Sequence, residues 1–163
     1  MAGPEPIYRA PMRARAIDAP GDAGAAFGLE HGLVGIGERL DEPPGSLEEA
    51  IQATREQHGD KAARMVRAFA ELPHGSLIWT RVDGFFHLGR INGRWRYDDS
   101  SEAHKAGIHN VRSATWLSRP FGEDEVPPAV SATFARGGRN LQRTHDSSAE
   151  RRTAELWEKW RGR

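Results

Sequence analysis

The sequence predicts an α+β fold with about five to six mostly antiparallel strands and flanking helices. The first observation is a pair of dipeptides, Asp83-Gly84 and Asn92-Gly93, that separate runs of β-branched, aromatic and basic residues. Both dipeptides suit the type I′ turn of a tight hairpin. The second is the helical spacing of apolar residues over 46–71 and near the C-terminus. The chain has 163 residues, which is long enough for a single domain over 1–163 that buries a sizeable core.

Strands and helices are interspersed in the N-terminal half. Residues 7–13 are predicted as a strand, 21–31 as a short helix and 32–40 as a buried strand that ends near Gly37. Ser46 and Glu49 form a capping-box pattern that opens a helix. Asp60 is predicted to cap a second helix over 61–71, which ends at Leu72-Pro73.

The centre of the chain is predicted as a three-stranded meander over 72–99. If each dipeptide forms a two-residue turn, Val82 lies opposite Phe85 and Trp79 opposite Leu88. The second turn then places Arg90 opposite Trp95 and Leu88 opposite Tyr97. Neither face of this meander is purely apolar, so we expect both faces to contact other elements.

The C-terminal part is predicted to hold one more strand and two helices. Residues 98–110 read as a polar loop at the rim of a site, and 111–117 as a strand. A short helix over 129–134 precedes a flexible basic loop over 135–140. Ser147 and Glu150 form a second capping box, which opens a terminal helix over 147–161.

Composition narrows the class of protein. The chain has no cysteine, no apolar run near the ~20 residues of a membrane span and no signal-peptide pattern, so a cytoplasmic location with no membrane partner is expected. The seven histidines lack metal-ligand spacing, so neither a metal nor a cofactor is expected. Thr144-His145-Asp146 is interpreted as a helix N-terminal turn rather than a catalytic triad. We therefore expect no enzymatic activity.

Charge is unevenly distributed along a chain whose formal net charge is zero. Residues 18–60 carry ten carboxylates against two arginines, whereas residues 135–163 carry eight basic residues against four acids. Residues 86–120 carry six basic residues against three acids. Such a bipolar molecule can present a local basic surface to phosphates. Aromatic residues interleaved with these arginines suit a flat base held beside a phosphate backbone.

The order of these segments resembles the PUA-like superfamily, closest to EVE and YTH-related domains and to the N-terminal modules of modification-dependent restriction proteins. The resemblance covers most of 5–145 and is carried by short pieces: Gly35 to Gly37, Ser76 to Ile78, Phe86 to Ile91, Tyr97-Asp98 and Arg112 to Leu117. It implies a small PUA-like β-barrel flanked by helices, with an aromatic cage that receives one modified base flipped from nucleic acid. Related modules often carry tryptophan directly after the Gly-Ile-Gly, where this chain has Glu38.

The base pocket that follows from this resemblance has Trp79 as its first wall and Trp95 or Tyr97 as its second. Asp98 or His87 would read the polar edge of the base, and Glu38 would accept from an exocyclic amine. Eight arginines are predicted to contact the nucleic-acid backbone: Arg39, Arg81, Arg90, Arg94, Arg96, Arg112, Arg139 and Arg143.

Three functions remain open at this point. The first is a reader of modified DNA in restriction or phage defence, which needs a separate effector protein such as a nuclease. The second is an RNA reader on the same fold, which would contact 2′-hydroxyls. The third is a protein-interaction module without a base pocket, docking through the terminal helix.

Overall fold

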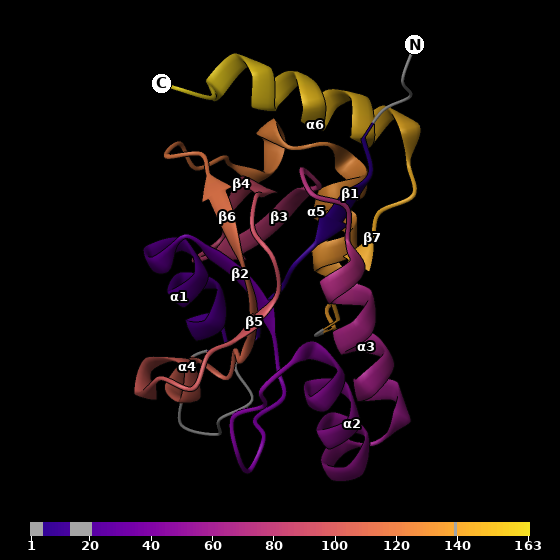
Figure 1. Cartoon of the computed structure of the whole chain (residues 1–163). Helices are drawn as coiled ribbons and strands as arrows, with labels where there is room; N and C mark the ends of the chain where they lie inside the picture. Colours follow the sequence, from indigo (N-terminus) through magenta and orange to yellow (C-terminus); the bar gives the residue numbers. More distant parts are fainter. Residues whose placement is uncertain (1–4, 14–20, 139) are drawn as a thin grey trace.

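The computed structural model describes residues 5–13, 21–138 and 140–163. Figure 1 shows a curled sheet with α1 and α4 at one side, the α2–α3 pair at the other, and α6 across one end. In the described part of the chain, six of the seven strands follow the order β2-β6-β4-β3-β1-β7, and the seventh, β5, pairs separately with β6. The strands are β1 (Ile7–Arg9), β2 (Leu33–Ile36), β3 (Leu77–Val82), β4 (Phe85–Ile91), β5 (Arg96–Tyr97), β6 (Asn110–Trp116) and β7 (Gln142–Arg143).

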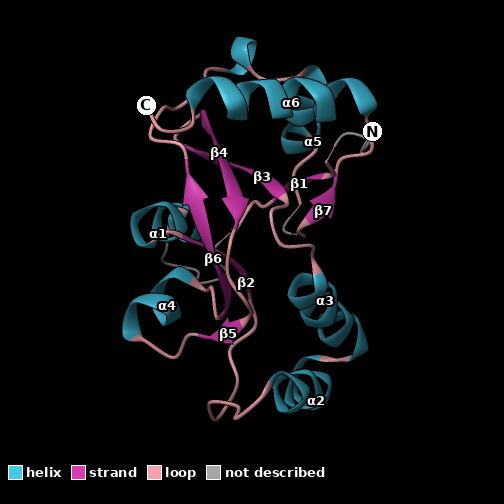
Figure 2. Ribbon diagram, turned by 45° about the horizontal axis from the view of Figure 1, so that its top comes forward, coloured by secondary structure: helices cyan, strands magenta, loops and turns pink. Residues whose placement is uncertain are grey.

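The helices cover both faces and one end of this sheet (Figure 2). They are α1 (Ala23–His31), α2 (Leu47–His58), α3 (Asp60–Glu71), α4 (Ser101–Ala106), α5 (Pro128–Ala135) and α6 (Ser147–Trp160), with a short 3-10 turn at Glu123–Glu125. The predicted α+β class, the mostly antiparallel sheet and the C-terminal helix are confirmed. The exception to antiparallel pairing is β1 with β3, which run parallel.

The first predicted hairpin is confirmed in type and register. Asp83 and Gly84 have φ values of 51° and 82°, as a type I′ turn requires. Val82 pairs with Phe85 and Trp79 pairs with Leu88.

The second predicted hairpin is wrong, because β4 pairs with β6 instead of with the segment that follows Asn92-Gly93. Ile91 lies opposite Ala114, and the Asn92 N–H donates to the Ser113 carbonyl. Gly93 is needed for a different reason than a turn, since a Cβ there would stand 2.7 Å from the Ser113 Cβ. The predicted pairs of Arg90 with Trp95 and Leu88 with Tyr97 therefore do not form.

Helix boundaries follow the predicted caps with small shifts. The Ser46 hydroxyl accepts from the Glu49 N–H at 3.1 Å, as predicted for α2. Gly59 occupies the N-cap of α3 instead of Asp60, and Asp146 caps α6 instead of Ser147 by accepting from the Ala149 N–H. The Asp146 cap confirms the helix-turn interpretation of residues 144–146.

Helix α4 lies inside the segment predicted as a polar loop. Its N-cap hydroxyl, from Ser100, accepts from the Ala103 N–H, and Gly107 ends it in the left-handed conformation. Six residues are too few for a clear periodic pattern, which is why sequence periodicity missed the helix.

Two apolar clusters lie on opposite faces of the β3–β4 hairpin. One contains Trp79, Phe86 and Leu88 together with residues of α5 and α6. The other contains Ile78 and Ile91 together with residues of α1 and α4. Both faces are therefore covered, as the mixed composition of the meander predicted. None of the described helices is long and apolar enough to cross a membrane.

Candidate functional site

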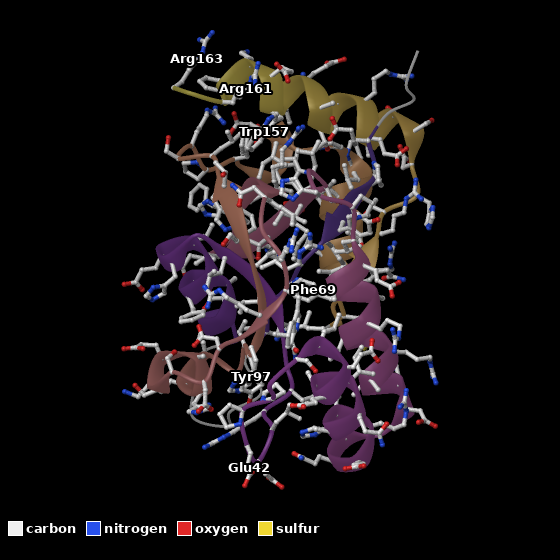
Figure 3. All side chains as sticks on the ribbon, viewed as in Figure 1. Glu42, Phe69, Tyr97, Trp157, Arg161 and Arg163 are labelled. Atoms are coloured by element: carbon white, nitrogen blue, oxygen red, sulfur yellow. The ribbon has the colours of Figure 1, made fainter. Side chains whose placement is uncertain are left out.

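The predicted pocket residues lie in two separate regions of the molecule. Trp79 belongs to the cluster under α6, which also contains Trp157. Figure 3 shows Trp157 beside α6 and Tyr97 near the opposite end, next to α4 and the loop that carries Glu42. A single cage containing both Trp79 and Tyr97 does not exist in this structure.

Trp79 is a core residue rather than the wall of a pocket. It is 1% exposed, its ring contacts the edge of Phe121 with centroids 5.6 Å apart, and its Nε1–H donates to the Thr153 hydroxyl of α6 at 3.1 Å. The prediction that Trp79 stacks on a base is therefore wrong, because no base can reach the ring.

His87 lies opposite Thr80 in the β3–β4 hairpin and lines neither of the two pockets described below. Burial lowers its pKa. The structure therefore does not place His87 with the other predicted base-reading residues.

Trp95 and Tyr97 hold the segment that follows β2 in place. The Trp95 Nε1–H donates to the Asn110 side-chain oxygen at 2.9 Å, and the Asn110 amide nitrogen donates to the Gly37 carbonyl at 2.9 Å. The Tyr97 hydroxyl accepts from the Leu40 N–H at 2.8 Å. The two predicted cage aromatics thus anchor Gly37 and Leu40, which lie on either side of Glu38.

Tyr97 is itself positioned by neighbours from α4 and β6. Its ring stacks on His109 with centroids 5.7 Å apart and an interplanar angle of 18°. Asp98 accepts from the Ser100 N–H at 3.0 Å, which fixes the entry to α4. Burial alone would raise the pKa of Asp98, but the hydrogen bonds from Ser100 and the charges of Arg96 and His109 lower it overall. Asp98 therefore helps to hold the turn into α4 and does not face an open surface.

We expect Tyr97→Phe to lower the free energy of unfolding by about 1–2 kcal/mol, because the buried Leu40 N–H loses its acceptor. Urea denaturation measures the loss, and faster hydrogen exchange at the Leu40 amide shows that it is local. Tyr8→Phe is the matched control, since the Tyr8 hydroxyl makes no hydrogen bond to the described residues. Equal effects of the two substitutions would contradict the anchoring role of Tyr97.

A pocket of about 230 Å³ opens where β2 ends, and we call it the strand-exit pocket. Five parts of the chain meet there: the segment after β1, the end of β2, the α2–α3 pair, the end of α4 and the residues before β7. It is lined by Met12, Arg13, Gly35, Ile36, Gly37, Glu38, His58, Lys61, Ala62, Met65, Gly107, Ile108 and Asn140.

Glu38 is the one predicted base-reading residue that lines the strand-exit pocket. Its side chain is 16% exposed, and a carboxylate oxygen lies 3.7 Å from His58 Nδ1. His58 Nε2 lies 2.6 Å from the Arg39 carbonyl, so that nitrogen carries the proton and donates. Glu38 and His58 therefore form one polar wall of the pocket.

The apolar walls of the strand-exit pocket are formed by methionine and isoleucine side chains. Met12 and Met65 line the pocket together with Ile36 and Ile108. Thioether side chains contact aromatic rings favourably and adapt to their shape. The pocket therefore combines apolar walls with a carboxylate and an imidazole, which suits a flat heteroaromatic ring with a polar edge.

Sequence reasoning missed Met12, although α1 carries a signal for it. Gly24 and Gly28 lie four residues apart on one face of α1. A Cβ at Gly24 would stand 2.0 Å from the Met12 carbonyl oxygen, and one at Gly28 would stand 3.1 Å from the Met12 sulfur. The two glycines thus allow Met12 to pack directly against the helix and to reach the pocket.

Arg139, one of the eight predicted phosphate-contacting arginines, lies outside the described residues, and the other seven fall into three groups. Arg39, Arg81, Arg94 and Arg96 are exposed. Arg143 pairs with Glu150 at 3.2 Å, and Arg90 pairs with Glu5 at 3.1 Å while lying over the Trp157 ring. The third group is Arg112 alone.

Arg112 is 4% exposed and cannot contact a phosphate backbone, so the prediction for it is wrong. Its guanidinium donates to the carbonyls of Phe69, Leu72 and Gly93 at 3.1, 2.7 and 2.8 Å. Burial lowers its pKa. Arg112 therefore caps the C-terminal end of α3 and ties this helix to β6.

Two histidines meet beneath the Tyr97 ring. His109 is 3% exposed and lies 4.9 Å from His104, measured between ring centroids. Burial is the main cause that lowers the pKa of His109. Protonation of His109 is therefore easier in the unfolded chain than in the folded protein.

Because the folded state binds fewer protons than the unfolded state just below pH 6.5, stability should rise with pH through this region. We expect the free energy of unfolding to fall between pH 7.5 and pH 5.5, and to fall less in His109→Gln. Urea denaturation across this range measures the slope. An unchanged slope in His109→Gln would contradict this assignment.

Among the described residues, no group of three or more His, Asp or Glu side chains is arranged to hold a metal ion.

No protein-family model matches this sequence, and no curated protein sequence matches it. Among solved structures, the chain is similar to the YTH domain of the Zygosaccharomyces rouxii MRB1 protein, crystallised in complex with N6-methyladenosine RNA. The sequences are 11% identical, the TM-score is 0.44, and the alignment covers 99% of this chain and 92% of that one.

Proposed function

We propose that this chain is a nucleic-acid-binding module that holds a single base in the strand-exit pocket. The observation that carries this proposal is the combination, in one cavity of about 230 Å³, of thioether and aliphatic walls with the Glu38 carboxylate. The family resemblance of residues 5–145 implies a base-reading module as well.

The wall chemistry fits a base better than a sugar or an aliphatic ligand. Met12 and Met65 offer sulfur and methylene surface to a ring face, and Ile108 completes the apolar lining. A base that leaves its stack must regain a few kcal/mol from such contacts and from hydrogen bonds to its polar edge. Glu38 accepts from an exocyclic amine in this arrangement, as carboxylates do from cytosine.

The charge at the pocket favours a polyanionic ligand. Arg13 and Lys61 line the cavity, and both side chains are exposed. Arg39 follows Glu38 directly and is exposed too. These cations neutralise phosphates on either side of a bound base, which makes binding salt-dependent.

A single strand suits this surface better than a duplex. Proteins that flip a base from a duplex often insert an apolar side chain into the stack. Among the described residues, Phe85 is the large hydrophobic residue that is exposed, at 53%. It lies at the β3–β4 turn and lines neither pocket. Extracting a base costs least from a strand that is already unpaired. The surface therefore suits a single strand of either kind; single-stranded RNA is our first candidate, and modified DNA with a separate effector such as a nuclease is the second.

The test compares two leucine substitutions on the same helix. Ala62 lines the strand-exit pocket, whereas Ala68 is exposed on α3 away from it. Fluorescence anisotropy would measure binding of short RNA and DNA strands, each unmodified or carrying one N6-methyladenine, 5-methylcytosine or 5-hydroxymethylcytosine. We expect wild type and Ala68→Leu to prefer one modified strand, and Ala62→Leu to lose the preference while keeping salt-dependent binding.

Two outcomes would contradict the proposal. Absence of binding to every strand at low salt would exclude a nucleic-acid function. Equal discrimination by Ala62→Leu and wild type would exclude the strand-exit pocket as the base site. A preference for DNA over RNA would instead support the modified-DNA form of the proposal.

A further inference from the structure

A second, larger cavity of about 400 Å³ is lined by the segment after β1, the start of α1, the β3–β4 turn and the loop after α5. We call it the arginine pocket, because Arg9, Arg13 and Arg81 line it together. Arg13 lines the strand-exit pocket as well. The two cavities are therefore neighbours that share one cationic side chain.

Arg9 is the fixed element of this pocket. It is 7% exposed and comes from β1 in the sheet. Its Nη1 donates to the carbonyls of Thr133 and Gly137 at 2.8 and 2.9 Å, and its Nε donates to the Asn140 carbonyl at 3.2 Å. These acceptors belong to the end of α5 and the loop behind it, where a cation is favourable.

The third nitrogen of the Arg9 guanidinium, Nη2, faces the loop that contains Gly137 and Gly138. Gly137 and Gly138 have φ values of 76° and 102°, and a Cβ at Gly138 would stand 2.9 Å from Arg9 Nη2. Both the backbone conformation and the close approach therefore require glycine. Among the described residues no carboxylate forms an ion pair with Arg9. Burial and the charge of Arg136 lower its pKa, as expected for a cation without a counter-charge.

The other lining residues leave the pocket with a positive balance. Asp22 and Asp83 line it opposite the three arginines, and an Asp22 carboxylate oxygen accepts from the Asp83 N–H at 3.1 Å. Arg81 is exposed and lies over the Phe86 ring, while Arg13 is exposed as well. One buried guanidinium and two exposed ones thus line the same cavity.

We infer that the arginine pocket binds a phosphate group, and that this phosphate belongs to the strand whose base enters the strand-exit pocket. The second part rests on the proposed function; the first does not. A phosphate accepts several charge-assisted hydrogen bonds, and the fork of a guanidinium matches its oxygens. Arg9 is already held on two nitrogens, so little further order is lost when its free edge binds.

The experiment tests the arginine pocket directly by titrating the protein with free anions. Two-dimensional ¹⁵N NMR would follow the Gly137 and Gly138 amides and the Arg9 Nε–H during titration with inorganic phosphate and with dimethyl phosphate, the latter mimicking a backbone diester. Chloride at matched ionic strength is the reference. We expect saturable shifts with at least one phosphate compound, weakened about tenfold in Arg81→Gln. Arg151→Gln, at an exposed position on α6, should behave as wild type.

Shifts that do not saturate, or that chloride reproduces, would overturn the phosphate site, and so would an unchanged affinity in Arg81→Gln. The link to the strand has its own test. In a plot of the logarithm of the oligonucleotide binding constant against the logarithm of the salt concentration, one lost phosphate contact in Arg81→Gln should make the slope less steep by about 0.7. An unchanged slope would overturn that link alone. Loss of base discrimination in Ala62→Leu is measured separately, so failure of the base pocket and failure of the phosphate site are distinguishable.

Discussion

Replacing Trp79 with alanine is expected to lower the free energy of unfolding by about 3–5 kcal/mol, the range for truncating a large buried aromatic side chain. The indole fills the cluster between the β3–β4 hairpin and α6, and it is 1% exposed. The truncation also removes the donor to Thr153, a side chain that is itself fully buried in α6. Urea denaturation with intrinsic fluorescence or circular dichroism measures the loss.

The control is Trp79→Phe, which keeps a ring in the cluster and should cost distinctly less than the alanine variant. Trp95→Ala provides a second comparison, because Trp95 is only partly buried and should cost less than Trp79→Ala. If Trp79→Ala instead unfolds at the wild-type urea concentration while nucleic-acid binding is lost, the ring contacts ligand and the core assignment is wrong. Binding by any Trp79 variant is therefore interpretable only under conditions where the variant is shown to be folded.

Sequence reasoning predicted most elements of this fold but not every pairing. The helices over 46–71, the β3–β4 register and the strand before Leu117 follow from local signals: caps, a type I′ dipeptide and alternation. The Asn92-Gly93 dipeptide carries an equally strong local signal, yet β6 occupies the edge of β4 at Ile91. Pairing between distant segments overrode the local turn preference there. The glycine serves close contact with Ser113 instead.

The site was harder to predict than the fold, because burial of a side chain cannot be read from its type. Glu38 lines the strand-exit pocket because it follows the exit of a glycine-containing strand, and its contact with a base stays a prediction. Tyr97 lies close to the predicted site but supports the backbone instead of facing the cavity. The prediction for Trp79 is wrong because the cluster under α6 buries this face of the hairpin, whereas Phe85 at the turn of the same hairpin stays exposed. The signal for Met12 lies in Gly24 and Gly28 of α1, which the sequence alone does not connect to it.

Two arginines illustrate the same difficulty with charged residues. Arg9 and Arg112 both lie in strands, both are nearly fully buried, and both donate to carbonyls at the end of a helix. In a sequence, an arginine that caps a helix from a neighbouring strand looks the same as one that contacts phosphate. The structure distinguishes the two side chains, because Arg9 also lines a cavity and Arg112 lines neither pocket.

Arg112→Met is expected to lower the free energy of unfolding by about 3–5 kcal/mol, because three carbonyls lose a charged donor within one buried site. Methionine keeps much of the aliphatic volume, so the loss reports the hydrogen bonds rather than a cavity. Arg112→Lys should recover only part of the stability, since an ammonium cannot reproduce the fork that spans Gly93, Phe69 and Leu72. Urea denaturation of the three proteins gives this order.

The same variants separate a positioning role from a phosphate contact. Arg112 ties α3 to β6, and α3 supplies Ala62 and Met65 to the strand-exit pocket. Loosening this helix should weaken discrimination between bases in folded Arg112→Lys, whereas the slope of binding against salt should stay at the wild-type value, because no phosphate contact is lost. A reduced slope in folded Arg112→Lys would show that the side chain reaches the nucleic-acid backbone after all. An unchanged slope with reduced discrimination would establish that α3 must be held by Arg112 for the pocket to keep its shape.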